Sequence, residues 1–292
     1  MTPQTSSSAY KSPAFSALLV IIAYMTEYGT NYEGLIDRHH IALSKIYDEA
    51  ELSAFKLRLE EFIGSDPSLP QILSLEGDEL VYDSESFVPP ISDPTKKSVV
   101  LVLGNPAPES VAMQAMFAYE NHGKRYHRFW RVLDETGILQ FSENPDTIDP
   151  HEKMLRLYRG DYSSPFNVSI VPFYSLPTPP GGKWGGVAGL QRLFGNAFKR
   201  IEAYDLERVE QFFAARLEGG DTVVVFQKDA YLAILQSPEE QVYDYRRLLQ
   251  EPTVSTINTS GGAELNLVCM LPTRLLHSHQ TKDALKKLSA PD

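Results

Sequence analysis

The sequence of 292 residues contains a single cysteine, Cys269, and no long apolar run. One cysteine excludes a disulfide framework, a cysteine zinc site and a cysteine-ligated iron–sulfur cluster, and it favours a reducing cytoplasm. The apolar stretch at residues 15–24 is too short to span a bilayer and has only Lys11 before it. We therefore interpret this stretch as a buried helix and expect no membrane partner.

Basic side chains are also scarce, with 27 Lys and Arg against 38 Asp and Glu, a net charge of −11. The deficit is uneven. Residues 1–97 hold 7 basic and 15 acidic side chains, or −8, and residues 98–292 hold 20 and 23, or −3. A nearly neutral segment can carry a basic groove, because local placement governs phosphate binding more than the total charge does. The net charge therefore does not exclude a nucleic-acid partner.

The first 97 residues are expected to form a tail and a small module. Residues 1–13 are rich in Ser, Thr and Pro, which predicts a disordered tail. Within residues 14–86, helices are predicted over residues 13–27, 32–44 and 48–63, followed by a β-hairpin of residues 71–75 and 79–83. This order is typical of a winged-helix-like module, and a helical cap on the main domain is the alternative. Residues 87–97 are interpreted as a linker because three prolines preclude regular structure there.

Beyond residue 97, buried strands alternate with helices. Residues 98–103 form a continuous β-branched and leucine run, which is typical of a strand buried on both faces of a parallel sheet. Similar runs recur at residues 168–171, 222–226 and 265–270, and helical patterns lie at residues 126–136, 187–200, 205–217 and 241–249. The alternation predicts a three-layer α/β/α domain with a mostly parallel central sheet over residues 98–292. The site is then expected in the loops at the carboxyl ends of the strands.

Short motifs occur in a fixed order on these strands. Asn105-Pro106 leaves the first strand, and Phe117-Ala118 precedes an Arg-Phe-Trp sequence that opens a helix at residue 128. Pro-Thr-Pro follows the second strand at residues 177–179, and Leu-Pro-Thr-Arg-Leu-Leu follows the last strand at residues 271–276. Over about residues 98–290 this order resembles the mismatch-specific branch of the uracil-DNA glycosylase superfamily. The resemblance implies a cofactor-free, monofunctional DNA glycosylase that flips a base out of double-stranded DNA, hydrolyses the base–sugar bond and leaves an abasic site.

The resemblance also implies roles for individual residues. Asn105 matches the position that orients the attacking water, and Phe117 matches the aromatic ring on which the flipped base stacks. Leu275 matches the wedge that fills the gap in the base stack, a role that Leu276 can share, and Arg274 beside it is a candidate phosphate contact. The base pocket is expected to consist of Gly104, Pro106, Ala107, Phe117, Pro172 and Phe173.

Three departures from the family pattern indicate the substrate. Pro172 stands where uracil-reading members often have Asn, Ala107 stands where the strictest uracil enzymes have a blocking Tyr, and Leu271 stands where some members have a catalytic His. These residues predict a pocket that is open at the pyrimidine 5-position. A 5-modified base such as hydroxymethylated or glucosylated cytosine, as found in phage DNA, is the expected substrate, which implies an antiviral role.

Without a histidine at position 271, another group must stabilise the leaving base. His277 lies on the same loop, nearest the presumed wedge, and is our candidate; His279, His122 and His127 are rivals. The glycine-rich loop that contains Lys183 is a candidate clamp for a backbone phosphate, although Trp184 after Lys183 excludes a P-loop.

Two other functions remain open from the sequence. One is a repair glycosylase for uracil or mismatched thymine, and the other is a catalytically silent nucleic-acid-binding protein. A carboxylate-pair glycosidase is disfavoured because Glu109 is the one acidic residue in the first and last candidate loops, and we interpret it as a helix-capping residue. No metal or organic cofactor is indicated, and the oligomeric state is open.

Overall fold

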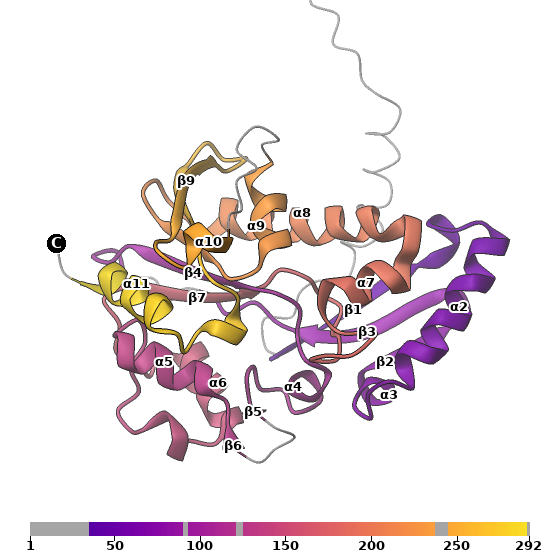
Figure 1. Cartoon of the computed structure of the whole chain (residues 1–292), viewed down its shortest axis with the longest axis horizontal. Helices are drawn as coiled ribbons and strands as arrows, with labels where there is room; N and C mark the ends of the chain where they lie inside the picture. The colour runs from indigo at the N-terminus through magenta and orange to yellow at the C-terminus, as the bar shows by residue number, and fades with distance from the viewer. Residues whose placement is uncertain (1–34, 90–92, 121–124, 237–244, 291–292) are drawn as a thin grey trace, which may run out of the picture.

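A computed structural model describes residues 35–89, 93–120, 125–236 and 245–290 (Figure 1). Its centre is a five-stranded sheet in the order β7 (Asn167–Pro172), β4 (Ser98–Leu103), β8 (Thr222–Val225), β10 (Glu264–Cys269) and β9 (Thr253–Asn258). The first four strands are parallel, and β9 pairs antiparallel to β10. The four buried strands predicted from the sequence are therefore confirmed. β9 was not predicted, because it is an edge strand whose Val254 side chain is 66% exposed.

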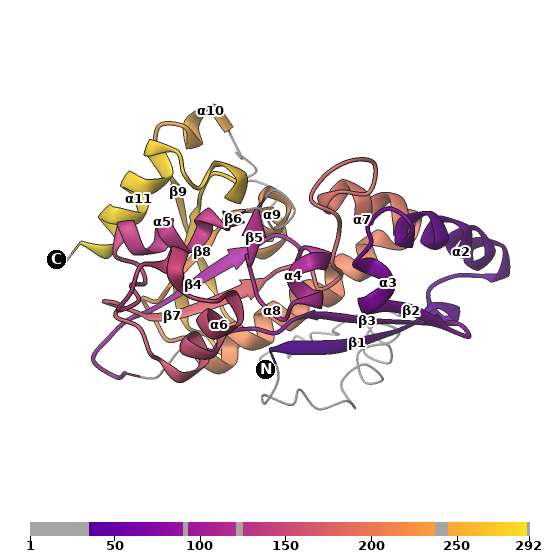
Figure 2. The same ribbon diagram turned by 90° about the horizontal axis from the view of Figure 1, so that it is seen from below.

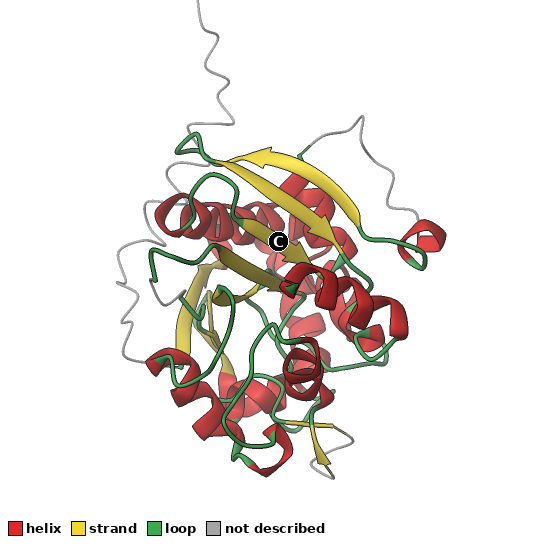
Figure 3. Ribbon diagram, turned by 90° about the vertical axis from the view of Figure 1, so that its left-hand side faces the viewer, coloured by secondary structure: helices red, strands yellow, loops and turns green. Residues whose placement is uncertain are grey.

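Helices cover both faces of this sheet (Figures 1 and 3). One face packs against α7 (Gly186–Phe194), α8 (Phe198–Arg216) and α9 (Lys228–Leu235), and the other against α5 (Arg128–Thr136), α6 (Pro150–Arg159) and α11 (His279–Ser289). Successive β4 residues point to opposite faces, so that Val100 and Val102 enter one core while Val99 and Leu101 enter the other. The three-layer α/β/α prediction is confirmed.

Short elements complete this part of the chain. They are α4 (Pro108–Ala112), the two-stranded pair β5 (Tyr119–Glu120) and β6 (Arg125–Tyr126), α10 (Tyr245–Leu248), and the 3-10 turns Pro145–Thr147, Gly195–Ala197 and Thr273–Leu275. The predicted helix break at residues 201–204 is absent, because α8 runs through it. Asp205 is buried inside that helix and its carboxylate accepts the backbone N–H of Ser175 at 3.0 Å.

The amino-terminal module is a three-stranded antiparallel sheet with two helices. Its strands are ordered β1 (Ile36–Ala42), β3 (Glu79–Glu85) and β2 (Leu73–Glu76), and its helices are α2 (Glu49–Ile63) and α3 (Leu69–Ile72), with a 3-10 turn at Leu43–Lys45. The predicted hairpin and the helix over residues 48–63 are confirmed. The helix predicted over residues 32–44 is wrong, because residues 36–42 pair along the full length of β3. The predicted tail and the first predicted helix, over residues 13–27, lie outside the described residues.

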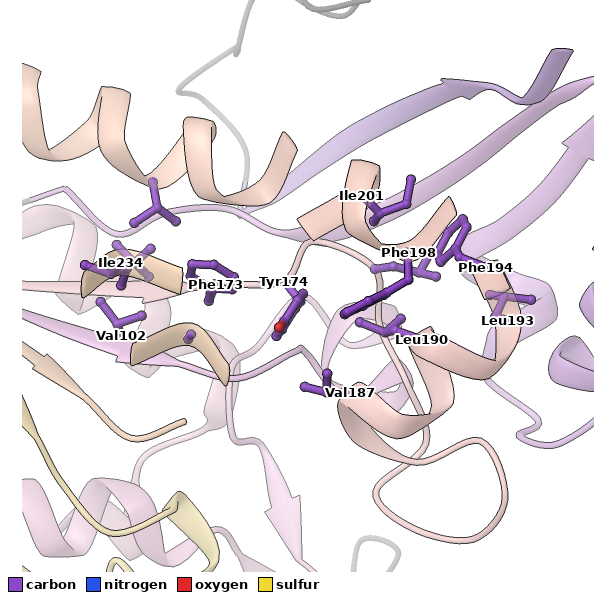
Figure 4. Close-up of a cluster of buried hydrophobic side chains, with 14 of the residues drawn as sticks. Val102, Phe173, Tyr174, Val187, Leu190, Leu193, Phe194, Phe198, Ile201 and Ile234 are labelled. Atoms are coloured by element: carbon purple, nitrogen blue, oxygen red, sulfur yellow. The ribbon is translucent and has the colours of Figure 1, made fainter. Parts of the chain in front are cut away.

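This module shares a core with the central sheet. Figure 4 shows Phe173, Tyr174, Phe194 and Phe198 gathered beside α7 and α8, and the same cluster continues through Phe55 of α2. The segment expected to be a linker also joins the sheet, since Val88 pairs antiparallel with Ile170 at the free edge of β7. The continuous core favours a cap on the main domain over a separate winged-helix module. No helix among the described residues is long and apolar enough to cross a membrane.

Candidate active site

A pocket of about 1330 Å³ opens at the carboxyl ends of the parallel strands. It exceeds the roughly 300–1,000 Å³ typical of small-molecule sites, so it has room for a nucleoside with a bulky substituent. Seven residues expected at the site from the sequence line it: Gly104, Asn105, Pro106, Ala107, Phe117, Pro172 and Arg274. Figure 2 shows α4 between the end of β4 and the amino-terminal module, and both parts of the chain contribute to the lining.

Asn105 is held by the loop that follows β7. Its side-chain amide donates to the Thr178 hydroxyl, which also accepts the Gly186 N–H at 3.0 Å. The Thr178 N–H donates to the Pro106 carbonyl at 3.0 Å, so the two loops are bonded to each other at two points. The other atom of this amide, the side-chain oxygen Oδ1 of Asn105, has no hydrogen-bond partner among the described residues. The oxygen can therefore accept a hydrogen bond from a water molecule in the pocket.

Phe117 is fixed in an unusual backbone conformation at the pocket wall. Its φ of 48° is left-handed, which costs about 1–3 kcal/mol for a residue other than glycine. The ring stacks on Phe129 at a centroid distance of 4.1 Å, and the Phe117 carbonyl accepts the Trp130 indole N–H at 3.2 Å. These contacts to α5 hold the strained residue at the pocket wall. The arrangement provides a rigid aromatic surface for a planar ligand.

His127 occupies the position beside this ring. It lines the pocket at 4.8 Å from the Phe117 ring centroid and caps α5, because its Nδ1 accepts the backbone N–H of Phe129 at 3.1 Å. A neutral histidine whose Nδ1 accepts carries its proton on Nε2. His127 is thus a donor of fixed tautomer beside the aromatic surface.

His277, our candidate from the sequence, lies outside the pocket lining. It is exposed, and its Nδ1 is 3.0 Å from Nη1 of Arg128, which does line the pocket. The sequence predicted a catalytic role for His277 from its place on the loop after β10, but the structure puts this residue beside a pocket-lining arginine and not in the lining itself.

Two residues expected at the site are in the protein core instead. Phe173 is fully buried, because it follows Pro172 directly and successive strand residues point to opposite faces. Leu276, expected to be an exposed wedge, is only 1% exposed and packs with α5 and α11. The wedge prediction for Leu276 is therefore wrong. Leu275 is partly buried against the other core, so its role as a wedge stays a prediction.

Lys183 also lies away from the pocket. Its Nζ pairs with the Glu61 carboxylate and sits 4.9 Å from the Trp184 ring centroid. These contacts attach the glycine-rich loop to α2, and the phosphate-binding role of Lys183 stays a prediction.

Glu85 is a lining residue for which the sequence analysis predicted no role, as are Asp66, Arg128, Thr178 and Lys228. It is the last residue of β3, is 5% exposed, and has no hydrogen-bond or ion-pair partner among the described residues. Burial raises the pKa of its carboxyl group to about 8. A buried carboxyl group with a raised pKa in a pocket is characteristic of functional sites. No motif in the sequence indicated it, because β3 was assigned to a separate module.

The rim of the pocket carries cations. Arg128 and Lys228 line it from the first residues of α5 and α9, and Arg274 from the turn at Thr273–Leu275; the acidic Asp66 and Glu109 line it as well. Lysine and arginine side chains distributed around a pocket can bind the phosphate groups of a nucleic-acid backbone. No group of His, Cys, Asp and Glu side chains in the described part of the chain is arranged to hold a metal ion.

No protein-family model and no curated protein matches the sequence. The resemblance to the uracil-DNA glycosylase superfamily therefore stays a prediction that depends on the motifs.

Proposed function

We propose that this protein is a DNA glycosylase that hydrolyses the base–sugar bond of a flipped, 5-modified pyrimidine and leaves an abasic site. The observation that carries the proposal is the convergence of Asn105, Phe117 and His127 on one pocket at the carboxyl edge of the sheet. These are a water acceptor, an aromatic surface and a hydrogen-bond donor. Each of the three can contribute to release of a flipped base.

Each residue has a distinct role in this reaction. The base stacks on Phe117, while the Asn105 carbonyl oxygen orients a water molecule toward the sugar carbon. Negative charge grows on the base as the bond breaks, and the Nε2–H of His127 stabilises it. Asn105 is a weak base, so the rate depends mainly on positioning and on electrostatic stabilisation of an oxocarbenium-like transition state.

The pocket wall supports a base with a 5-substituent. Ala107 and Pro172 both line the pocket and present small, apolar surfaces where uracil-specific enzymes are expected to have a blocking ring and a recognising amide. The Pro172 carbonyl already accepts a bond from Arg208 at 3.1 Å. This lining disfavours plain uracil and leaves space for a hydroxymethyl or glucosyl group, such as those on modified phage cytosines.

Base release from defined duplexes tests the proposal. DNAs with uracil, 5-hydroxymethylcytosine or glucosylated 5-hydroxymethylcytosine are incubated with wild type and with Asn105→Ala, and abasic sites are detected by strand cleavage. We expect release from the modified cytosines alone, and a loss of about 10²–10³-fold in the variant. Release from uracil alone would support a repair enzyme. Binding without release from any DNA would overturn the proposal and support a silent binding protein.

A further inference from the structure

The end of β3 brings a carboxyl group to the site from the amino-terminal module. Glu85 is its last residue, and three residues later Val88 exchanges backbone hydrogen bonds with Ile170 of β7, at 2.9 and 3.3 Å. This single bridge holds the segment after β3 against the free edge of β7. Glu85, at the end of β3, lines the pocket at the carboxyl edge of the central sheet.

The same edge leads from Glu85 to the proposed water site. Pro172 pairs with Leu103 of β4, and Asn105 follows two residues later. Glu85 and Asn105 line the same pocket. A nucleoside in the pocket has its sugar carbon at one end and the hydrogen-bonding edge of its base at the other, so it can meet one of these residues at each end.

We infer that Glu85 is a catalytic acid that binds the hydrogen-bonding edge of a flipped amino-pyrimidine, a base of the cytosine class, and protonates its N3 as the base leaves. This inference rests on the proposed function. A neutral carboxyl group offers one donor and one acceptor side by side. N3 of cytosine accepts and its 4-amino group donates, so both bonds form at once.

The surroundings keep Glu85 neutral near pH 7. Burial alone raises its pKa to about 8, with no cation close enough to oppose the effect. Glu85 lies near the Tyr158 phenol, whose pKa is raised by burial first and then by the charges of Asp37 and Glu85. The other titratable groups of the pocket are Asp66, Glu109, His127, Arg128, Lys228 and Arg274.

The reaction balances without a further reagent. The bond between N1 and the sugar carbon breaks with its electron pair on the base, and the proton of Glu85 moves to N3, so the base leaves as a neutral molecule. The water oxygen bonds to the sugar carbon and its proton passes to solvent, from which Glu85 is reprotonated.

An amino-pyrimidine needs this acid more than a keto-pyrimidine does. A uracil-type base spreads the departing negative charge over two carbonyl oxygens. A cytosine-type base has one carbonyl oxygen and an electron-donating amino group, so it gains more from a proton on N3. Loss of Glu85 is therefore expected to affect the two classes unequally.

Matched substrates and an isosteric variant test whether loss of the Glu85 acid slows release of cytosine-type bases more than release of uracil-type bases. Duplexes carry 5-hydroxymethyl or glucosylated 5-hydroxymethyl forms of both cytosine and uracil, so that the members of each pair differ only in the group at position 4 and in the hydrogen on N3. Single-turnover release is measured for wild type and Glu85→Gln from pH 6 to 10, with Asn105→Ala as the control for chemistry and thermal melting as the control for folding. The glutamine amide can form both bonds to cytosine but cannot transfer a proton.

We expect Glu85→Gln to slow release of the cytosine forms by about 10²-fold or more, with DNA affinity unchanged, and to slow the uracil forms less than about tenfold. The wild-type rate on cytosine forms should fall about tenfold per pH unit above pH 8, and the variant should lose this dependence. Equal losses on the cytosine and uracil forms, or an unchanged pH profile in the variant, would overturn the role of Glu85 but not the proposed function. No release from any duplex by the wild type would overturn the proposed function as well.

Discussion

The ring of Phe117 stacks on the ring of Phe129 with the centroids 4.1 Å apart and the planes 16° from parallel. Phe129 is fully buried in the core between the sheet and α5, so the contact attaches a pocket residue to the rigid part of the molecule. A base that stacks on Phe117 would join an aromatic pair that is already ordered. Binding then requires little further ordering of the protein.

Replacement of Phe117 tests this surface. We expect Phe117→Leu to lower single-turnover base release by about 5–150-fold, because base–aromatic stacking contributes about 1–3 kcal/mol per base. Phe117→Tyr keeps the aromatic face and should stay within a few-fold of wild type. Both variants retain a β-carbon at the left-handed position, so the backbone strain is the same in each. Equal activity of the two variants would show that the ring supplies only apolar packing.

Variants of His127 and His277 can show which of the two histidines stabilises the leaving base. His127→Asn preserves a side-chain acceptor for the Phe129 N–H at the start of α5 but removes the ring donor. We expect melting close to that of wild type and a loss of roughly 10²-fold in base release. His277→Ala removes an exposed ring outside the pocket and should change release less than threefold, or by under about 1 kcal/mol. The opposite order of losses would return the role to His277.

Thr178 is expected to act through Asn105. Thr178→Val leaves the Asn105 amide and the Gly186 N–H without their shared acceptor. The free energy of unfolding should fall by about 1–3 kcal/mol in urea denaturation. Base release should fall by about tenfold, less than in Asn105→Ala, because the amide remains present but is poorly oriented. Thr178→Ser retains the hydroxyl group and is the matched control; a comparable loss in that variant would exclude the hydroxyl as the cause.

The buried Glu85 carboxyl group also makes folding stability depend on pH. Its pKa is about 8 when folded and near 4.5 when unfolded, so the folded state holds the proton more tightly. The stabilisation is complete below pH 4.5 and is lost as the pH rises through 8. Relative to Glu85→Gln, the wild type should lose about 3–5 kcal/mol between pH 4 and pH 9, since each pH unit of separation corresponds to about 1.4 kcal/mol.

Urea denaturation of both proteins across this range measures the difference. Glu264→Gln, an exposed change at the start of β10, should show no such divergence from wild type. Parallel pH profiles for wild type and Glu85→Gln would show that the carboxyl group is hydrated when the protein is folded.

Some elements were predictable because their local sequence is unambiguous. The continuous apolar run of β4 is compatible with a strand buried on both faces and with little else. The start of α5 was predicted to within two residues, at residue 126 against Arg128 in the structure. By contrast, residues 36–42 and the exposed strand β9 have weak local patterns, and their state depends on the strand beside them.

The sequence by itself determined the parallel sheet, its two helical layers and the edge at which Asn105, Phe117 and Pro172 lie. These follow from local periodicity and from the rule that parallel strands end together. Only the tertiary structure decided that Leu276 is buried, that His127 replaces His277 in the pocket, and that Glu85 joins the site. The reason is that side-chain burial and strand pairing between distant segments depend on non-local contacts, such as that between Val88 and Ile170, which no local pattern encodes.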